Sequence, residues 1–143
     1  MKVAGKVSWF GGPPDLAEGG ISADEPLAFI YEVTDRPQVF LPGAKVALAQ
    51  CLDPEVYYIA CRWDYDNPEQ TREMLLTNIA WVRSPETGMA LPAYPADWGP
   101  HVDTGRVADI SPGLMEDLGI MTDDEVEVIF PAPMRRSVEE VLA

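Results

Sequence analysis

The amino-acid sequence predicts a mainly β protein built as one small β-barrel, and three observations support this prediction. About seven segments are rich in β-forming residues and end at Gly, Pro or Asp. Only one or two short helices are indicated. The chain has 143 residues, of which 47% are hydrophobic and four are Trp, enough for one domain with a core. Many short strands and few helices favour a barrel over a sandwich or an α/β sheet.

The N-terminal part of the chain contains three of the expected strands. Apolar and polar side chains alternate in residues 5–10, as in a half-buried strand. Residues 13–25 are polar and rich in Gly and Pro, which is typical of a loop. The remaining segments here are strands at 27–33 and 39–41, and a segment at 44–50 that fits either a short helix or a strand.

The rest of the chain contains four more expected strands. The strongest is 55–64, where β-branched and aromatic residues alternate with others. A helical turn at 68–73 leads into a strand at 73–83. Proline interrupts the short strand at 90–94, which places that strand at a sheet edge. The strand at 124–130 alternates charged with apolar residues and is half-buried.

One helix has clear start and stop signals. Ser111 is a good N-cap, and Pro112 follows at the first helical position, where its missing N–H costs nothing. Leu114 and Leu118 share one face, and Gly119 is suited to end the helix in a left-handed conformation. The carboxylate of Asp109 comes just before this helix, in the positive field of its N-terminus.

Charge and cysteine content exclude several functions. The net charge of −14 argues against nucleic acid and against an anionic membrane surface, because both need clustered Lys and Arg. Cys51 and Cys61 are too few for a disulfide scaffold, and their spacing matches no metal motif. A bridge between them is possible, but the simplest interpretation of Cys61 is a buried thiol in a strand. With one His, the sequence indicates no metal site and no cofactor.

The N-terminus has no apolar stretch typical of a signal peptide, and no window approaches the roughly 20 apolar residues of a membrane span. We therefore expect cytoplasmic synthesis. Any export would follow a route other than general secretion.

Four stretches resemble the double-psi β-barrels of the rare-lipoprotein-A-like group. Residues 5–11 (GKVSWFG) resemble the family's opening G-x-A-S-W-Y-G, and residues 97–101 (DWGPH) resemble its N-D-R-G-P-F. Residues 105–111 (GRVADIS), followed by 118–120 (LGI), resemble G-R-I-I-D-L-S followed by L-G-I. Residues 125–128 (EVEV) resemble the closing strand.

This resemblance implies a six-stranded double-psi β-barrel with one or two short helices and inserted loops. The wider group includes expansins, family 45 glycoside hydrolases and lytic transglycosylases, and many members bind or cut β-1,4-linked polysaccharide, peptidoglycan included. The family's catalytic acids fall on Asp97 and Asp109. The family's T-A-A-H segment has no counterpart here, and Trp98 stands where the family has Arg.

Each candidate site residue has a simpler alternative. Asp103 is a further candidate carboxylate near the same turn, expected to bind substrate. Asp97 also fits an Asx-turn, Asp109 the electrostatics of the helix end, and Asp103 a turn. His101 is a candidate proton shuttle or hydrogen-bond partner of Asp97, although a lone His in a Gly/Pro turn is more often structural.

Aromatic residues are candidate platforms for sugar rings. Trp98 and Tyr94 are the first choices because they lie in or beside loops near the turn, and Trp9 is a further candidate. Trp63 and Trp81 fall in strands and are expected in the core. Residues 64–66 (DYD) form an acidic pair that suits Ca²⁺, but such pairs are usually solvated turns.

The predicted domain organisation is a barrel over residues 1–131, with an insertion at about 35–90, and a C-terminal tail at 132–143. Within the tail, Val138, Val141 and Leu142 have helical spacing. A tail this short is marginal alone, so we expect residues 134–143 to dock on the domain or on an assembly partner.

Two functional hypotheses remain. The first is a polysaccharide-directed barrel that binds or cleaves peptidoglycan, like a lytic transglycosylase or a glycoside hydrolase if it is active. A phage lysin or tail-associated protein would reach the wall without a signal. The second is a non-catalytic assembly module, such as a virion component, which the missing T-A-A-H segment and the tail favour.

Overall fold

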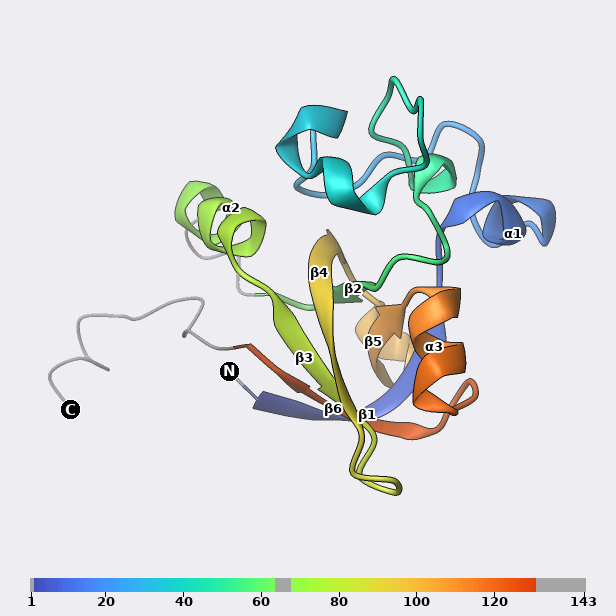
Figure 1. Ribbon diagram of the computed structural model, residues 1–143, viewed down its shortest axis with the longest axis vertical. Coiled ribbons are helices and arrows are strands. Elements are labelled where there is room, and N and C mark those ends of the chain that lie inside the picture. Colours follow the sequence, from blue (N-terminus) through green and yellow to red (C-terminus); the bar gives the residue numbers. More distant parts are fainter. Residues whose placement is uncertain (1, 64–67, 131–143) are drawn as a thin grey trace, which may run out of the picture.

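The computed structural model describes residues 2–63 and 68–130, and within them six strands close into a mixed β-barrel (Figure 1). The order of the strands around the barrel is β1-β5-β2-β4-β3-β6. The strands are β1 (Lys2–Trp9), β2 (Tyr58–Cys61), β3 (Ala80–Arg83), β4 (Ala90–Trp98), β5 (Arg106–Ile110) and β6 (Glu125–Ile129). The helices are α1 (Gly12–Ala17), α2 (Pro68–Thr77) and α3 (Pro112–Leu118), with 3-10 turns η1 (Val33–Asp35), η2 (Pro37–Val39), η3 (Ala49–Cys51) and η4 (Val102–Thr104). The predicted mainly β barrel with inserted loops is confirmed, with three short helices where the sequence indicated one or two.

The strand pairing divides the barrel into two halves of the same plan. The pairs β1–β5 and β2–β4 are parallel, and the other four pairs are antiparallel. Exchanging β1, β2 and β3 with β4, β5 and β6 leaves this pattern unchanged. Helix α2 joins β2 to β3 as α3 joins β5 to β6. The halves differ in one connection, because residues 10–57 join β1 to β2 while residues 99–105 join β4 to β5.

Residues 10–57, called the excursion here, gather at one end of the barrel (Figure 1). Three predictions for the excursion were wrong. The expected strand at 39–41 is absent, because residues 37–39 form η2 and Phe40 pairs with Leu52 in an isolated bridge. The expected loop at 13–25 contains α1, because Pro13 and Pro14 occupy the first helical turn, where proline fits. The expected strand at 27–33 is absent. Leu27, Phe29 and Ile30 are buried in the core, and side chains bond the backbone of the segment where a neighbouring strand would. The N–H of Ala28 donates to Asp97 Oδ1, and the backbone oxygen of Phe29 accepts from Arg72 Nε.

Helix α3 agrees closely with its predicted signals. Ser111 Oγ accepts a hydrogen bond from the backbone N–H of Leu114 at 3.3 Å. Leu114 and Leu118 are buried, and Gly119 ends the helix with φ of 70°. The strand predicted at 124–130 is also confirmed as β6.

Two other strands, β4 and β3, differ from their predictions. Strand β4 is not an edge strand. It lies between β2 and β3 and continues to Trp98, because the closed barrel gives it two neighbours despite its prolines. Helix α2 extends to Thr77, so β3 begins only at Ala80. Trp81 of β3 was expected in the core but is 41% exposed on the outer face of the barrel.

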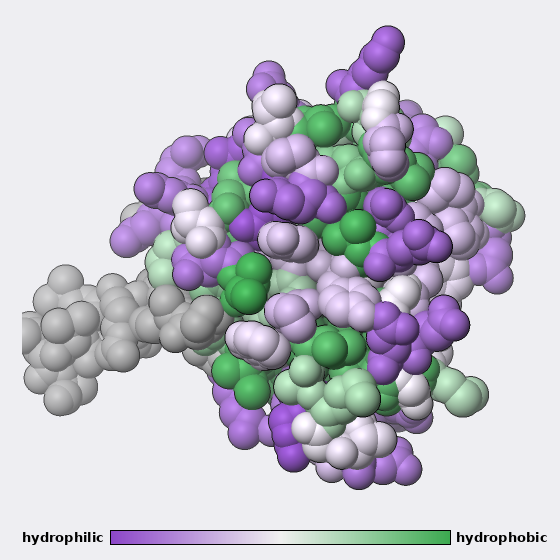
Figure 2. All heavy atoms as spheres, in the orientation of Figure 1, coloured by the Kyte–Doolittle hydropathy of each residue, from purple (hydrophilic) through white to green (hydrophobic). Residues whose placement is uncertain are grey.

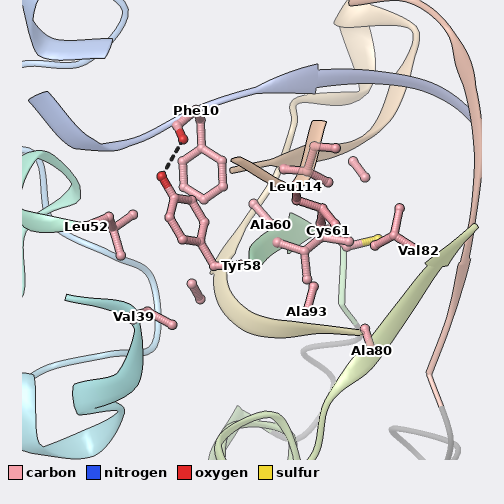
Figure 3. Close-up of a cluster of buried hydrophobic side chains, with 14 of the residues drawn as sticks. Phe10, Val39, Leu52, Tyr58, Ala60, Cys61, Ala80, Val82, Ala93 and Leu114 are labelled. Carbon is pink, nitrogen blue, oxygen red and sulfur yellow. Dashed lines mark hydrogen bonds between the residues drawn. The ribbon is translucent and has the colours of Figure 1, made fainter. Parts of the chain in front are cut away.

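The core continues from the barrel into the excursion without a break. Tyr58 of β2 is fully buried, and its hydroxyl donates a hydrogen bond to the backbone oxygen of Phe10 at 2.7 Å (Figure 3). Val39 and Leu52 of the excursion are also fully buried, in the same cluster as Tyr58 (Figure 3). The excursion and the barrel therefore share one core.

Several further predictions have a clear position in the structure. Cys61 is a buried thiol in β2, as predicted, and it and Cys51 are both free. The range 35–90, predicted to hold an insertion, includes β2, α2 and β3, so two barrel strands fall within it. Residues 64–66 and the tail at 132–143 lie outside the described residues.

Hydrophilic residues cover most of the face shown in Figure 2, and hydrophobic residues form separate small groups on it. Among the described helices, none has the length and apolar character needed to cross a membrane.

Candidate functional site

The two predicted catalytic acids lie in one row of residues that runs across four strands. Ala60 of β2 is the register partner of Asp97 in β4 and of Asp109 in β5, and Asp109 is also the partner of Ser8 in β1. Side chains of register partners lie on the same face of a sheet, so both carboxylates flank the small side chain of Ala60. Two strand spacings place their Cα atoms about 10 Å apart.

This row faces away from the barrel interior and opens into a cavity. Residues on either side of Asp109 in β5, Ala108 and Ile110, are fully buried, so Asp109 points to the opposite face. The cavity has a volume of about 640 Å³. It is lined by the barrel, by the excursion and by the connection from β4 to β5. The lining residues are Ser8, Trp9, Phe10, Asp15, Glu18, Gly20, Ile21, Glu25, Ala60, Asp97, Trp98, Gly99, Pro100, His101, Thr104, Arg106 and Asp109.

Asp97 joins the barrel to the excursion. Its Oδ1 accepts hydrogen bonds from the backbone N–H groups of Ala28 and Trp98, each at 2.8 Å. Burial raises the pKa of Asp97 to about 6, since these two hydrogen bonds offset only part of the desolvation, and the carboxylate of Glu25 raises it further. The Asx-turn predicted as the simpler alternative is absent, because the N–H that it needs, that of Gly99, donates to the backbone oxygen of Cys61 at 3.1 Å.

Asp109 has the more strongly raised pKa of the pair. Burial raises the pKa of Asp109 to about 7, the guanidinium of Arg106 lowers it, and the carboxylates of Asp15 and Asp97 raise it. Within residues 2–63 and 68–130, no hydrogen bond to its carboxylate offsets the desolvation. Arg106 gives it limited support, because its Nε donates to Asp123 Oδ1 at 2.9 Å.

His101 lines the cavity, but its Nδ1 atom is engaged elsewhere. This nitrogen accepts a hydrogen bond from the backbone N–H of Asp103 at 3.2 Å and lies 3.4 Å from Asp103 Oδ2. Asp103 itself is 89% exposed and is not among the residues that line the cavity. The predicted roles of His101 in proton transfer and of Asp103 in substrate binding remain predictions.

Two of the three predicted aromatic platforms line the cavity, and one does not. Trp9 and Trp98 lie at its wall, and Trp98 is held by a hydrogen bond from its Nε1 to the backbone oxygen of Trp63 at 2.9 Å. Tyr94 is not part of the lining, and the guanidinium of Arg36 lies 5.3 Å from its ring centre. Trp63 is buried in the core, as predicted.

The sequence interpretation missed the acidic wall that the excursion contributes. This wall consists of Asp15, Glu18 and Glu25. Asp15 is 7% exposed, and its Oδ2 accepts a hydrogen bond from the backbone N–H of Gly11 at 2.8 Å. The signal was present, because a Pro-Pro pair followed by Asp is a helix start with an acid in its first turn.

The arrangement suits proton transfer to and from a polar ligand. In the part of the chain that the structure describes, no group of three His, Cys, Asp or Glu side chains is placed to hold a metal ion.

In comparisons with known proteins, no family model and no curated protein matches this chain.

Proposed function

We propose that this protein is a polysaccharide-directed double-psi β-barrel that binds and cleaves a glycan of the peptidoglycan type. One observation carries the proposal: Asp97 and Asp109 flank Ala60 on one face of the barrel and share a cavity with Trp9 and Trp98. Proton donors and aromatic faces beside an open cavity are what glycan cleavage requires.

The double-psi assignment has two supports. The first is the pairing of two equivalent halves with two parallel strand pairs. The second is the position of the motif residues, since the stretches 97–101 and 105–111 bound the same cavity. Both acids that the resemblance assigned to catalysis thus belong to one site.

The pKa values of the two acids suggest a division of roles. Asp109, with a pKa of about 7, holds its proton in about half of the molecules at neutral pH and is the general acid for the bridging oxygen. Asp97, with a pKa of about 6, is mostly ionised at that pH, and two N–H donors fix its position. It stabilises positive charge that develops on the sugar ring or acts as the base.

Muropeptide release from purified sacculi tests this proposal. Asp109→Asn removes the proton donor and is expected to reduce the rate of release by about 10²–10⁴-fold, with Asp97→Asn close behind. The matched control is Glu86→Gln, which removes one exposed carboxylate from the hairpin between β3 and β4. Anhydro products would indicate a lytic transglycosylase, and reducing ends a hydrolase. No release by the parent protein on any glycan would refute the enzymatic part.

A second candidate function, a non-catalytic assembly module, is favoured by exposed apolar residues around β3. Ile79, Trp81 and Met89 are 36%, 41% and 47% exposed. If this surface and residues 134–143 bind a partner in a virion or another assembly, deletion of residues 134–143 should abolish co-purification with the partner or self-association. An unchanged sedimentation profile with no partner lost would count against this function. Both proposals include delivery of the protein to its site of action within a virion or by cell lysis.

A further inference from the structure

The cavity that holds Asp97 and Asp109 contains more carboxylates than proton transfer needs. Three additional acids, Asp15, Glu18 and Glu25, line it from the excursion. Their charge reaches the pair, because the carboxylate of Glu25 raises the pKa of Asp97 and that of Asp15 raises the pKa of Asp109. Like charges in one cavity repel each other, and a bound cation relieves that repulsion.

Cationic side chains do not balance these acids. Of the described residues that line the cavity, Arg106 and His101 are the two that can be cationic. Arg106 is shared with Asp123, to which its Nε donates at 2.9 Å. The Nδ1 atom of His101 is engaged by Asp103, since it lies 3.2 Å from the backbone nitrogen and 3.4 Å from Oδ2 of that residue.

The acids are also arranged unlike a metal site. In the described residues, no three acidic, His or Cys side chains converge on one point. The negative charge is instead distributed among residues of the excursion that line a cavity of about 640 Å³, which Trp98 and the turn that follows it also line. A wall of this kind suits an extended ligand with separated positive groups better than it suits a single ion.

Asp15 is the most buried member of this wall. Its side chain is 7% exposed, and one oxygen, Oδ2, accepts a hydrogen bond from Gly11. The other oxygen, Oδ1, lies where a Cβ on Gly20 would be only 1.9 Å away. Gly20 and Asp15 both line the cavity, so the missing side chain at Gly20 is what allows this carboxylate oxygen its position there.

We propose that the cleft selects glycans that carry primary ammonium groups, as de-N-acetylated hexosamine units do, over neutral N-acetylated and anionic glycans. Glu18 and Glu25 bind the ammonium groups of units beside the one that Asp97 and Asp109 act on, and Asp15 adds to the negative potential. This inference rests on the proposed glycan function, since the aromatic walls and the carboxylate pair supply the sugar site.

Calorimetric titration of the full chain at about pH 6 with three tetrasaccharides tests the inference. The ligands are the de-N-acetylated glucosamine oligomer, its N-acetylated form and an oligouronate, and spermidine serves as a cation without sugar rings. We expect the de-N-acetylated oligomer to bind about tenfold or more tightly than the N-acetylated one, with the preference falling as salt rises. Glu18→Gln with Glu25→Gln should reduce this preference to about threefold or less, whereas Glu86→Gln should leave it unchanged.

The outcomes separate this inference from the proposed function. Equal binding of the de-N-acetylated and N-acetylated oligomers would overturn the charge selection and leave the glycan function standing. Binding of spermidine as tight as that of the amino-sugar oligomer would overturn the sugar-specific part. Failure of every oligosaccharide to bind would overturn both. A preference that survives in the Glu18→Gln, Glu25→Gln variant would also refute the inference, because the acidic wall would not be its source.

Discussion

The two connections that lead from the first to the second strand of each barrel half differ greatly in length, and both reach the same cavity. Residues 99–105 join β4 to β5 directly and carry His101. Residues 10–57 join β1 to β2 and carry α1, three 3-10 turns and the acids of the cavity wall. The comparison indicates that the barrel strands hold Asp97 and Asp109, while the longer connection supplies the acidic residues around them.

The two connections also differ in how they are stabilised. The short one is held by Arg62, which donates to the backbone oxygen of Pro100 within the connection at 2.9 Å and to that of Arg106 at the start of β5 at 2.7 Å. The long one is held by burial, since Phe29, Val39 and Leu52 are almost completely inaccessible to solvent. The excursion is therefore expected to unfold together with the barrel and not as a separate unit.

The largest expected effect tests that shared core. Leu52→Ala in the excursion and Leu114→Ala in α3 should each lower the free energy of unfolding by about 2–5 kcal/mol, because each leaves a cavity at a fully buried position. Urea denaturation followed by Trp fluorescence measures both. Val46→Ala, at a residue that is 53% exposed, is the control and should change stability by less than about 0.5 kcal/mol. A separate early transition in Leu52→Ala would show that the excursion unfolds independently.

A smaller effect is expected where the excursion meets α3. A Cβ on Gly113 would lie 2.8 Å from the backbone oxygen of Pro54, which accepts a hydrogen bond from the N–H of Gly113. Gly→Ala in a helix normally stabilises by up to about 1 kcal/mol, but here the clash should reverse the sign and cost about 1–3 kcal/mol. Thermal denaturation checks this, with Glu116→Ala on the exposed face of α3 as the control. A gain in stability would mean that the contact between Gly113 and Pro54 has room for a methyl group.

The pH dependence of stability should report the buried acids of the barrel face. Asp97 and Asp109 have pKa values raised from 3.8 to about 6 and about 7 in the folded state. Folding therefore binds protons between about pH 4 and 7, and the stability that they contribute is full below about pH 4 and lost as pH rises through 6 and 7. Asp97→Asn and Asp109→Asn should each raise the free energy of unfolding at about pH 8 by roughly 1–3 kcal/mol, with little change near pH 4. Equal effects at both pH values would contradict the raised pKa values.

The smallest expected effect concerns Arg106, whose side chain is partly exposed. Arg106→Gln breaks the ion pair with Asp123 and should cost less than about 1 kcal/mol of stability. The same change should raise the pKa of Asp109 further, since Arg106 is the charge that lowers it. NMR titration of the Asp109 carboxyl carbon measures that shift, and Asp123→Asn is the matched control that leaves the cation in place. An unchanged pKa of Asp109 in the Arg106→Gln variant would show that the charge of Arg106 does not act on Asp109.

The contrast between the barrel and the excursion also explains which parts of the fold and of the candidate site could be predicted from the sequence. The barrel elements 105–130 follow local rules that can be read from residue types, such as the cap at Ser111, the stop at Gly119 and the alternation in β6. Asp97 and Asp109 could be proposed as a pair from the motifs. The excursion could not be predicted in this way, because its apolar residues are buried without the spacing of a helix or a strand. The β-forming residues of 27–33 therefore suggested a strand that the fold does not contain. The acids at 15, 18 and 25 join the cavity only through this tertiary packing.

The pairing of the first strand has a consequence for synthesis and folding. Both neighbours of β1 in the barrel, β5 and β6, come from residues 106–129. Of the six described strands, β1 is made before the others but finds its partners last, and both its edges stay unpaired until residues 106–129 are available. Closure of the barrel is a late, long-range step, which predicts slow folding for a chain of this size. Until that step, the row from Ser8 to Asp97 is not assembled, so the cleft and the closed barrel form together.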